Sequence, residues 1–183
     1  MSFLHSFGDS IAAGYPFGTS VCYAARAATA LGRTHVQYAV NGSKIADVAA
    51  AIAAITPSTA DIYTIGVGLN DARDNGVGTN GVYAFYQSLL GSVQHLVMNN
   101  PAHVFLFTPS LQTLGGTAGF TACGGTPEAT ASFADAVRCV AFETGVQLID
   151  AYALIGPSDL VDGGHWFDTA HYQMGSRVAL RAG

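Results

Sequence analysis

Short apolar runs alternate with longer segments in which apolar residues recur at helical spacing along the whole chain. Unbroken apolar runs of this kind are typical of strands that are buried on both faces of a parallel sheet. The pattern predicts five strands, at residues 3–7, 35–40, 61–67, 103–108 and 146–150. It predicts five helices, at residues 20–31, 45–55, 82–98, 128–144 and 168–180. This alternation indicates an α/β fold with a mostly parallel sheet between two layers of helices.

The length of 183 residues suits a single domain, residues 1–183, and is short for two independent ones. No apolar run approaches the roughly 20 residues that a membrane-spanning helix needs, so we expect no membrane-spanning segment. One long segment, residues 110–127, is rich in Gly and Thr and carries no periodicity. Irregular segments of that length inside a compact domain are usually functional or mobile.

Charged residues make up only 10% of the chain, and the formal net charge is -5. Lys44 is the only lysine and the arginines are scattered, so no basic surface for nucleic acid is expected. So few charges favour an extracellular or particle-associated protein. No basic segment followed by an apolar stretch precedes the first predicted strand, and a signal peptide is therefore not predicted.

The three cysteines have different expected environments. Cys123 and Cys139 flank the Gly-rich segment and the start of a predicted helix, and this separation permits a disulfide without requiring one. Cys22 lies in an apolar helical stretch, where a small buried hydrophobic residue is expected.

Polar clusters follow the predicted strands. In an open parallel sheet, ligands bind outside the carboxyl ends of the strands, where the winding direction reverses. We therefore expect four clusters to converge on one edge of the sheet: Gly8-Asp9-Ser10, Asn41-Gly42, Gly68-Leu69-Asn70-Asp71 and Asp162-Gly163-Gly164-His165.

These clusters contain the parts that acyl transfer requires. Ser10 could attack an ester carbonyl while His165 removes its proton, and Asp162 lies close enough in sequence to orient the imidazole. The backbone N–H groups of Ser10 and Gly42 and the side-chain amide of Asn70 could hold the oxyanion. Each motif alone could be a turn, but four in order beside strand ends favour the catalytic interpretation.

In order and position, the four clusters resemble the four sequence blocks of the SGNH (GDSL-type) hydrolase superfamily, over nearly the whole chain. The resemblance implies a flavodoxin-like three-layer α/β/α fold with sheet order 2-1-3-4-5. It also implies a Ser-His-Asp catalytic set, an oxyanion hole from Ser, Gly and Asn, and no cofactor or metal. Known activities of the superfamily include esterases, carbohydrate deacetylases, lysophospholipases and thioesterases, so the resemblance does not choose the substrate.

The C-terminal block contains the same spacing twice, since Asp162-x-x-His165 is followed by Asp168-x-x-His171. The superfamily pattern aligns His165 with the catalytic position and His171 with a later histidine in the last helix. Trp166 and Ala170 depart from the Pro and Gly that are common in that pattern. We therefore predict Asp162 and His165 as the pair that serves Ser10, with Asp168 and His171 as the alternative.

The substrate is the least determined part of the prediction. Residues 111–127 are mainly Gly, Thr and Ala, with few large side chains to form an apolar groove for a long acyl chain. Short acyl groups are therefore favoured. Tyr15 and Trp166 could stack on a sugar ring or merely pack. We predict a short-chain esterase acting on O-acetyl groups of carbohydrates. The alternatives are a lipase-like or thioesterase activity on longer chains, or a non-catalytic carbohydrate-binding module with the same fold.

Overall fold

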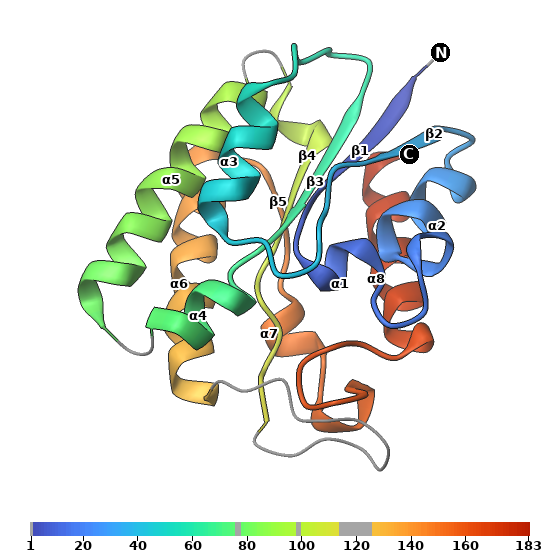
Figure 1. Ribbon diagram of the computed structural model, residues 1–183. Helices are drawn as coiled ribbons and strands as arrows, with labels where there is room; N and C mark the ends of the chain where they lie inside the picture. Colours follow the sequence, from blue (N-terminus) through green and yellow to red (C-terminus); the bar gives the residue numbers. More distant parts are fainter. Residues whose placement is uncertain (1, 76–77, 98–99, 114–125) are drawn as a thin grey trace.

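The computed structural model describes residues 2–75, 78–97, 100–113 and 126–183. Its centre is a five-stranded sheet in the order β2-β1-β3-β4-β5, in which all neighbours are parallel (Figure 1). The strands are β1 (Phe3–Gly8), β2 (Thr34–Gln37), β3 (Ile62–Gly66), β4 (Val104–Phe107) and β5 (Gln147–Ile149). The predicted strand order is confirmed, although four of the five strands are shorter than the apolar runs that predicted them.

Strand β4 is the one strand of the sheet that is apolar throughout, because both of its faces are covered. Phe105 and Phe107 point into the core on one face of the sheet, whereas Val104 and Leu106 point into the core on the other. Because successive side chains of a strand alternate between faces, a strand covered on both faces has no position left for a polar residue.

Helices form a layer on each face of the sheet (Figure 1). One layer contains α1 (Ser10–Ala13), α2 (Tyr23–Ala30) and α8 (Asp168–Ala182), and the other contains α3 (Ile45–Ala53), α4 (Leu69–Asn75), α5 (Thr79–Val97) and α6 (Pro127–Thr144). The five predicted helices are present. The short helices α1, α4 and α7 (Ala151–Leu154) were not predicted, because four to seven residues show no helical periodicity. Three 3₁₀ turns complete the described elements, at Thr19–Val21, Pro101–His103 and Pro157–Asp159.

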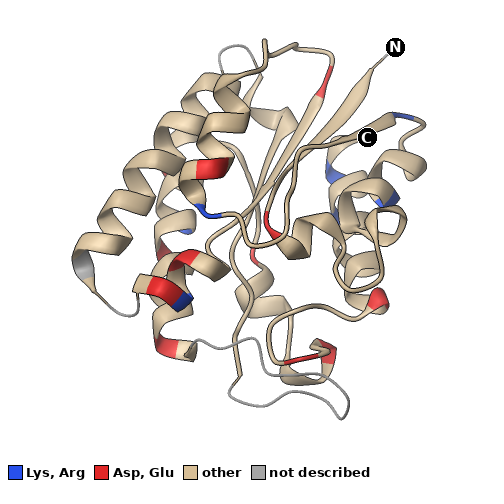
Figure 2. Ribbon diagram, in the orientation of Figure 1, with Lys and Arg blue, Asp and Glu red and all other residues tan. Residues whose placement is uncertain are grey.

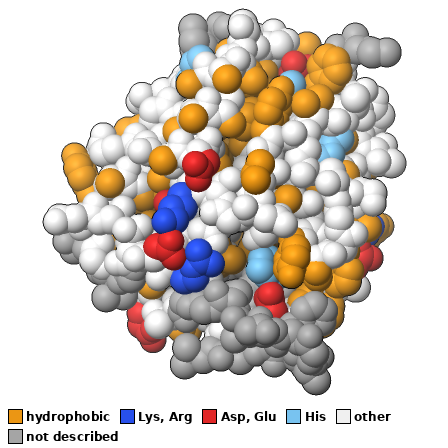
Figure 3. Space-filling model, in the orientation of Figure 1, with side chains coloured by type: hydrophobic (Ala, Val, Ile, Leu, Met, Phe, Trp, Pro, Cys, Tyr) orange, Lys and Arg blue, Asp and Glu red, His pale blue; other side chains and the backbone are white. Residues whose placement is uncertain are grey.

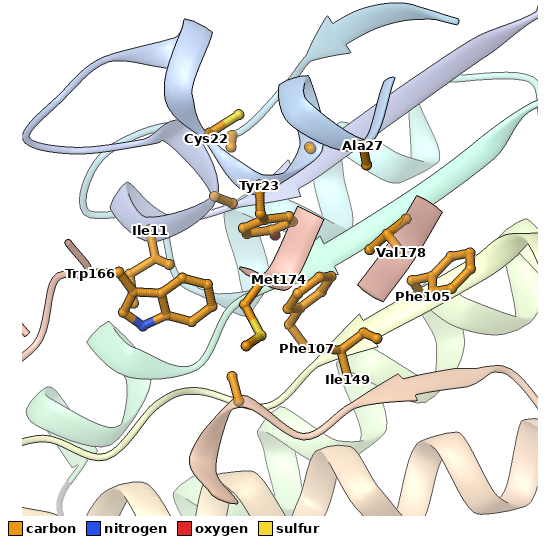
Figure 4. Packing of buried hydrophobic residues seen from close by; sticks show 14 of the residues in the cluster. Ile11, Cys22, Tyr23, Ala27, Phe105, Phe107, Ile149, Trp166, Met174 and Val178 are labelled. Carbon is orange, nitrogen blue, oxygen red and sulfur yellow. The ribbon is translucent and has the colours of Figure 1, made fainter. Parts of the chain in front are cut away.

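The core between the sheet and α2 and α8 is built around aromatic rings (Figure 4). Tyr23 of α2 stacks on Phe107 of β4 with ring centroids 4.1 Å apart, and Trp166 and Met174 pack beside them. Cys22, which caps α2, is fully buried in the same cluster, as expected from its apolar neighbours.

Charged side chains are sparse over the ribbon (Figure 2). Within the described part of the chain, no helix combines the length and apolarity needed to cross a membrane. Cys123 lies outside the described residues, as does most of the Gly-rich segment. Cys139, which is exposed on α6, is a free cysteine, so the structure does not form the disulfide with Cys123 that the spacing permitted.

Candidate active site

Ser10 is the first residue of α1 and follows the carboxyl end of β1 after a single residue. A tight approach of β1 to β3 fixes this turn: a Cβ on Gly8 would lie 2.1 Å from the carbonyl oxygen of Gly66. Asp9 then caps α1, because its carboxylate accepts a 3.0 Å hydrogen bond from the N–H of Ile11. Strand, glycine and cap together hold Ser10 at the edge of the sheet, with 7% of its surface exposed.

His165 and Asp162 come from the loop between β5 and α8, at the same edge. Nε2 of His165 lies 2.7 Å from Oγ of Ser10, and Nδ1 of His165 lies 2.6 Å from Oδ2 of Asp162. The other carboxylate oxygen of Asp162 accepts hydrogen bonds from the N–H groups of Gly164 and His165, at 3.1 and 2.8 Å. The imidazole is therefore held between a hydroxyl on one nitrogen and a carboxylate on the other.

Burial by itself raises the pKa of Asp162, but the hydrogen bonds from the backbone and imidazole of His165 outweigh burial and hold this pKa below its ordinary value. Asp162 is thus a carboxylate at neutral pH. A carboxylate on Nδ1 favours the tautomer whose Nε2 is free to accept a proton from Ser10.

Gly42, in the segment after β2, and Asn70, in α4, line the same pocket as Ser10. Gly42 adopts a positive φ of 83°, which favours glycine, and no atom lies within 4 Å of the position a Cβ would take. Asn70, in the first turn of α4, donates a 3.0 Å hydrogen bond from Nδ2 to the carbonyl of Ser43. An amide nitrogen carries two hydrogens, so this bond orients the amide and leaves its second hydrogen for another acceptor.

Asp9 and Asp71 are hydrogen-bond acceptors for backbone N–H groups of the segments around the site. The carboxylate of Asp71 accepts from the N–H of Ile45 at 3.2 Å to each oxygen, which ties α4 to the start of α3. Burial raises the pKa of Asp9 to about 7 and that of Asp71 to about 6. Neither carboxylate is assigned a chemical step.

Ser10 lies in the wall of one open pocket of about 290 Å³. Its described walls are Ser10, Tyr15, Asn41, Gly42, Asn70, Arg73, Asp162 and His165. On the face seen in Figure 3, the most prominent Lys and Arg side chains lie beside Asp and Glu side chains in one group, and most of the remaining face is uncharged. An arrangement of a serine hydroxyl, an imidazole, a carboxylate and amide donors in one pocket is suited to acyl transfer.

A sequence model of the GDSL-like lipase/acylhydrolase family matches residues 6–173. The chain belongs to that family. Its members are ester hydrolases of the serine type, and this chain is accordingly an enzyme of that class. No sequence among the curated proteins matches the chain significantly.

Solved structures with the GDSL-type hydrolase fold cover almost the whole chain. A lipase/acylhydrolase from Enterococcus faecalis superposes with a TM-score of 0.77 at 18% identity, over 98% of this chain and 94% of that one. Est24, a carbohydrate acetylesterase from Sinorhizobium meliloti, gives 0.74 at 16% identity over 99% and 98%. An aryl esterase from M. smegmatis gives 0.69 at 19% identity over 99% and 98%. At these identities the likeness concerns the fold.

The second Asp-x-x-His spacing of this GDSL-family chain lies in α8 and not at Ser10. His171 is fully buried against Tyr23 and Trp166, and burial lowers its pKa to about 4. Asp168 pairs with Arg26 at the surface. The geometry therefore joins Ser10 to His165, and the alternative pair has no contact with Ser10.

The structure corrects the prediction that Trp166 contacts substrate. Only 1% of its surface is exposed, and its indole nitrogen donates a 2.9 Å hydrogen bond to Oγ of Ser110. A short antiparallel bridge between Leu160 and Trp166 turns the chain so that His165 faces the pocket and Trp166 faces the core. Trp166 is therefore a packing residue beneath the site.

Tyr15 does lie at the pocket. Its ring meets the ring of His165 edge-on with centroids 4.7 Å apart, and 42% of its surface is exposed. Of the two other wall residues, Asn41 belongs to a cluster that the sequence analysis placed at this edge without giving the side chain a role, and Arg73 was missed. Arg73 follows Asn70 by three residues on α4, and this spacing would have indicated a shared helix face had α4 been predicted.

Lys44 is partly exposed and forms an ion pair with Asp74 at 2.6 Å. Two of the histidines outside the site have polar partners elsewhere in the fold. His35 contacts the hydroxyl of Ser6 at 2.8 Å, and His95 contacts the carbonyl of Ile55 at 3.1 Å. Among the described residues, no cluster of three or more His, Cys, Asp or Glu is placed to hold a metal ion.

Proposed function

We propose that the chain hydrolyses short-chain acyl esters through an acyl-enzyme on Ser10, and that its substrates are O-acetyl groups of carbohydrates. The observation that carries the proposal is the continuous contact from Oγ of Ser10 to Nε2 of His165, and from Nδ1 of His165 to Asp162. A serine hydroxyl is a poor nucleophile without a base in hydrogen-bond reach, and these contacts supply one.

In the first half of the reaction, Oγ of Ser10 attacks the ester carbonyl as His165 takes the hydroxyl proton. The negative charge on the carbonyl oxygen is met by the N–H groups of Ser10 and Gly42 and by the amide of Asn70. His165 then passes its proton to the leaving alcohol oxygen, and the ester C–O bond breaks. Asp162 stabilises the imidazolium between these two transfers.

In the second half, a water molecule enters from the open pocket and attacks the acyl-serine while His165 takes one of its protons. The same three donors hold the second oxyanion. The bond to Oγ of Ser10 then breaks, and His165 returns the proton to Ser10. The acid leaves and the site regains its starting protonation state.

The pocket wall supports a short acyl group. Apart from Tyr15, its described lining consists of hydroxyl, amide, charged, imidazole and glycine groups, with no aliphatic side chain among them. A long acyl chain gains its binding free energy by burying methylene groups, at about 0.8 kcal/mol each. A wall of this kind provides little apolar surface for the methylene groups of a long acyl chain. An acetyl group needs little apolar surface.

A series of 4-nitrophenyl esters tests the reaction and the acyl length together. The wild-type protein should hydrolyse the acetate and butyrate, with kcat/KM falling for the octanoate, and Ser10→Ala should hydrolyse none of them above background. Release of acetate from acetylated xylo-oligosaccharides, followed by chromatography, tests the carbohydrate part. A folded wild-type protein without esterase activity on any member of the series would instead favour a binding module, and a preference for octanoate would favour a lipase-like enzyme.

A further inference from the structure

A second hollow of about 430 Å³ adjoins the pocket that contains Ser10. It lies between the segment after α1 and the segment after β2, and its walls are Ala13, Tyr15, Pro16, Gly18, Thr19, Gln37, Ala39, Val40 and Asn41. Tyr15 and Asn41 line both hollows, so the second hollow lies beside the pocket of Ser10 across these two side chains; we refer to the two hollows together as the groove. A combined groove of this size falls within the range of small-molecule binding sites.

The walls of this second hollow are held by the fold. The N–H of Tyr15 donates to the carbonyl of Ser10 at 2.9 Å, and the N–H of Gly18 donates to the carbonyl of Gly14 at 2.8 Å. On the opposite wall, the N–H of Val40 donates to the carbonyl of Gly8 at 3.1 Å. Both walls are therefore anchored to the turn that carries Ser10, and the groove keeps its position relative to the nucleophile.

The chemistry of the second hollow is neutral. None of its lining residues is charged; they are one aromatic ring, amide and hydroxyl groups, and small apolar surfaces. Tyr15 and Val40 are exposed there to 42% and 61%. An exposed aromatic face with neutral hydrogen-bonding groups beside it matches a sugar ring, whose C–H face packs on the ring while its hydroxyls bond to amides and water.

The position of Tyr15 indicates which part of the substrate lies in this hollow. His165 must pass its proton to the alcohol oxygen, so the alcohol part of the ester lies on the His165 side of the reacting carbon. Tyr15 is in edge-on contact with His165, at 4.7 Å between ring centroids. The groove that continues past Tyr15 therefore extends on the alcohol side.

We propose that this second hollow is a binding site for the sugar that carries the ester, and that it selects neutral pyranose rings. This inference rests on the proposed esterase function, because it assigns the alcohol side from the role of His165. It adds the place where the glycan binds, the residues that bind it, and the preference for uncharged over acidic glycans.

Calorimetric titration of the Ser10→Ala protein tests the site without turnover. The probes are xylotetraose, cellotetraose and mannotetraose as neutral glycans and trigalacturonate as an acidic one. At least one neutral probe should bind, and trigalacturonate should bind more weakly than that probe. In the same background, Tyr15→Ala and Val40→Glu should each weaken the affinity for the neutral probe by about fivefold or more.

Tyr83→Ala is the matched control, because Tyr83 is 65% exposed on α5 and lies outside the groove. Its affinity should equal that of the Ser10→Ala protein. Failure of every neutral probe to bind at millimolar concentration, or an equal loss in Tyr83→Ala, would overturn the proposed site. Tyr15→Ala also removes the contact of Tyr15 with His165. Val40→Glu is therefore included, because it changes the same hollow at a different residue.

The same protein preparation separates this inference from the proposed function. If wild type hydrolyses 4-nitrophenyl acetate but the Ser10→Ala protein binds no neutral glycan, the esterase proposal stands and the sugar site is wrong. If wild type hydrolyses no ester and yet glycan binding depends on Tyr15 and Val40, the binding site stands and the proposed reaction is wrong.

Discussion

Asn70 donates a 3.0 Å hydrogen bond to the carbonyl of Ser43, the residue that follows Gly42. This bond connects the loop after β3 to the loop after β2, and it joins two of the three proposed oxyanion donors. This hydrogen bond therefore orients the amide of Asn70 and also holds the segment that presents the N–H of Gly42.

We expect Asn70→Ala to lower kcat on 4-nitrophenyl acetate by about 10²- to 10³-fold, with a smaller change in KM. The donor acts on charge that develops in the transition state, so substrate binding should largely survive. Asn75→Ala serves as the control, because Asn75 also donates to a backbone carbonyl on α4 but does not line the pocket. Unchanged kcat in folded Asn70→Ala would make Asn70 a turn residue only.

The two histidines of the C-terminal block should respond in opposite ways. We expect His165→Ala to lower kcat by about 10⁴-fold or more, because the general base is removed. His171→Ala should leave a cavity in the core and lower the free energy of unfolding by about 1–3 kcal/mol, with kcat per folded molecule nearly unchanged. Thermal unfolding and active-site titration measure the two effects separately. A large loss of kcat in folded His171→Ala, with activity retained in His165→Ala, would identify His171 as the general base.

The two aspartates offer an independent test of the same assignment. Asp162→Asn should lower kcat by about 10²- to 10⁴-fold, because an amide on Nδ1 no longer favours the productive tautomer. Asp168→Ala should cost about 1 kcal/mol or less, since it removes an exposed pair with Arg26 and an acidic group in the first turn of α8. Steady-state kinetics and chemical denaturation of both variants check this contrast. Equal kinetic losses in the two variants would contradict it.

The buried carboxyl of Asp9 should make stability depend on pH. Its pKa is raised by burial from 3.8 to about 7, so the folded state keeps the proton that the unfolded chain releases. This contribution to stability is complete below pH 4, falls as the pH rises from 4 to 7, and is lost above 7, with a change on the order of 4 kcal/mol.

Asp9→Asn removes the titrating proton and keeps an oxygen that can accept from Ile11. We therefore expect its melting temperature to rise relative to wild type as the pH changes from 4.5 to 8, as measured by calorimetry. Asp135→Asn, which changes an exposed carboxylate on α6, should not follow this trend. A difference between Asp9→Asn and wild type that stays constant with pH would mean that Asp9 is ionised throughout.

Much of the fold was predictable from short stretches of sequence. Apolar runs such as the one around Phe105 predict buried strands because burial on both faces favours apolar side chains, and the position of each of the five strands was predicted from such mainly apolar runs. The edge of the sheet that carries the site was also predictable, since the carboxyl ends of parallel strands lie together. Ser10, Gly42, Asn70, Asp162 and His165 line one pocket there.

The environment of each side chain was decided only by the tertiary structure. Asp162-x-x-His165 and Asp168-x-x-His171 have the same spacing, yet the first lies in a loop that reaches Ser10 and the second in a helix that faces the core. Trp166 is adjacent to His165 in sequence and is turned away from the pocket, whereas Arg73 joins the pocket through a helix too short to predict. Sequence patterns over a few residues determine local conformation and which face is apolar. Exposure and distance depend on contacts between segments far apart in the chain, and these exist only after the sheet and its helices have packed.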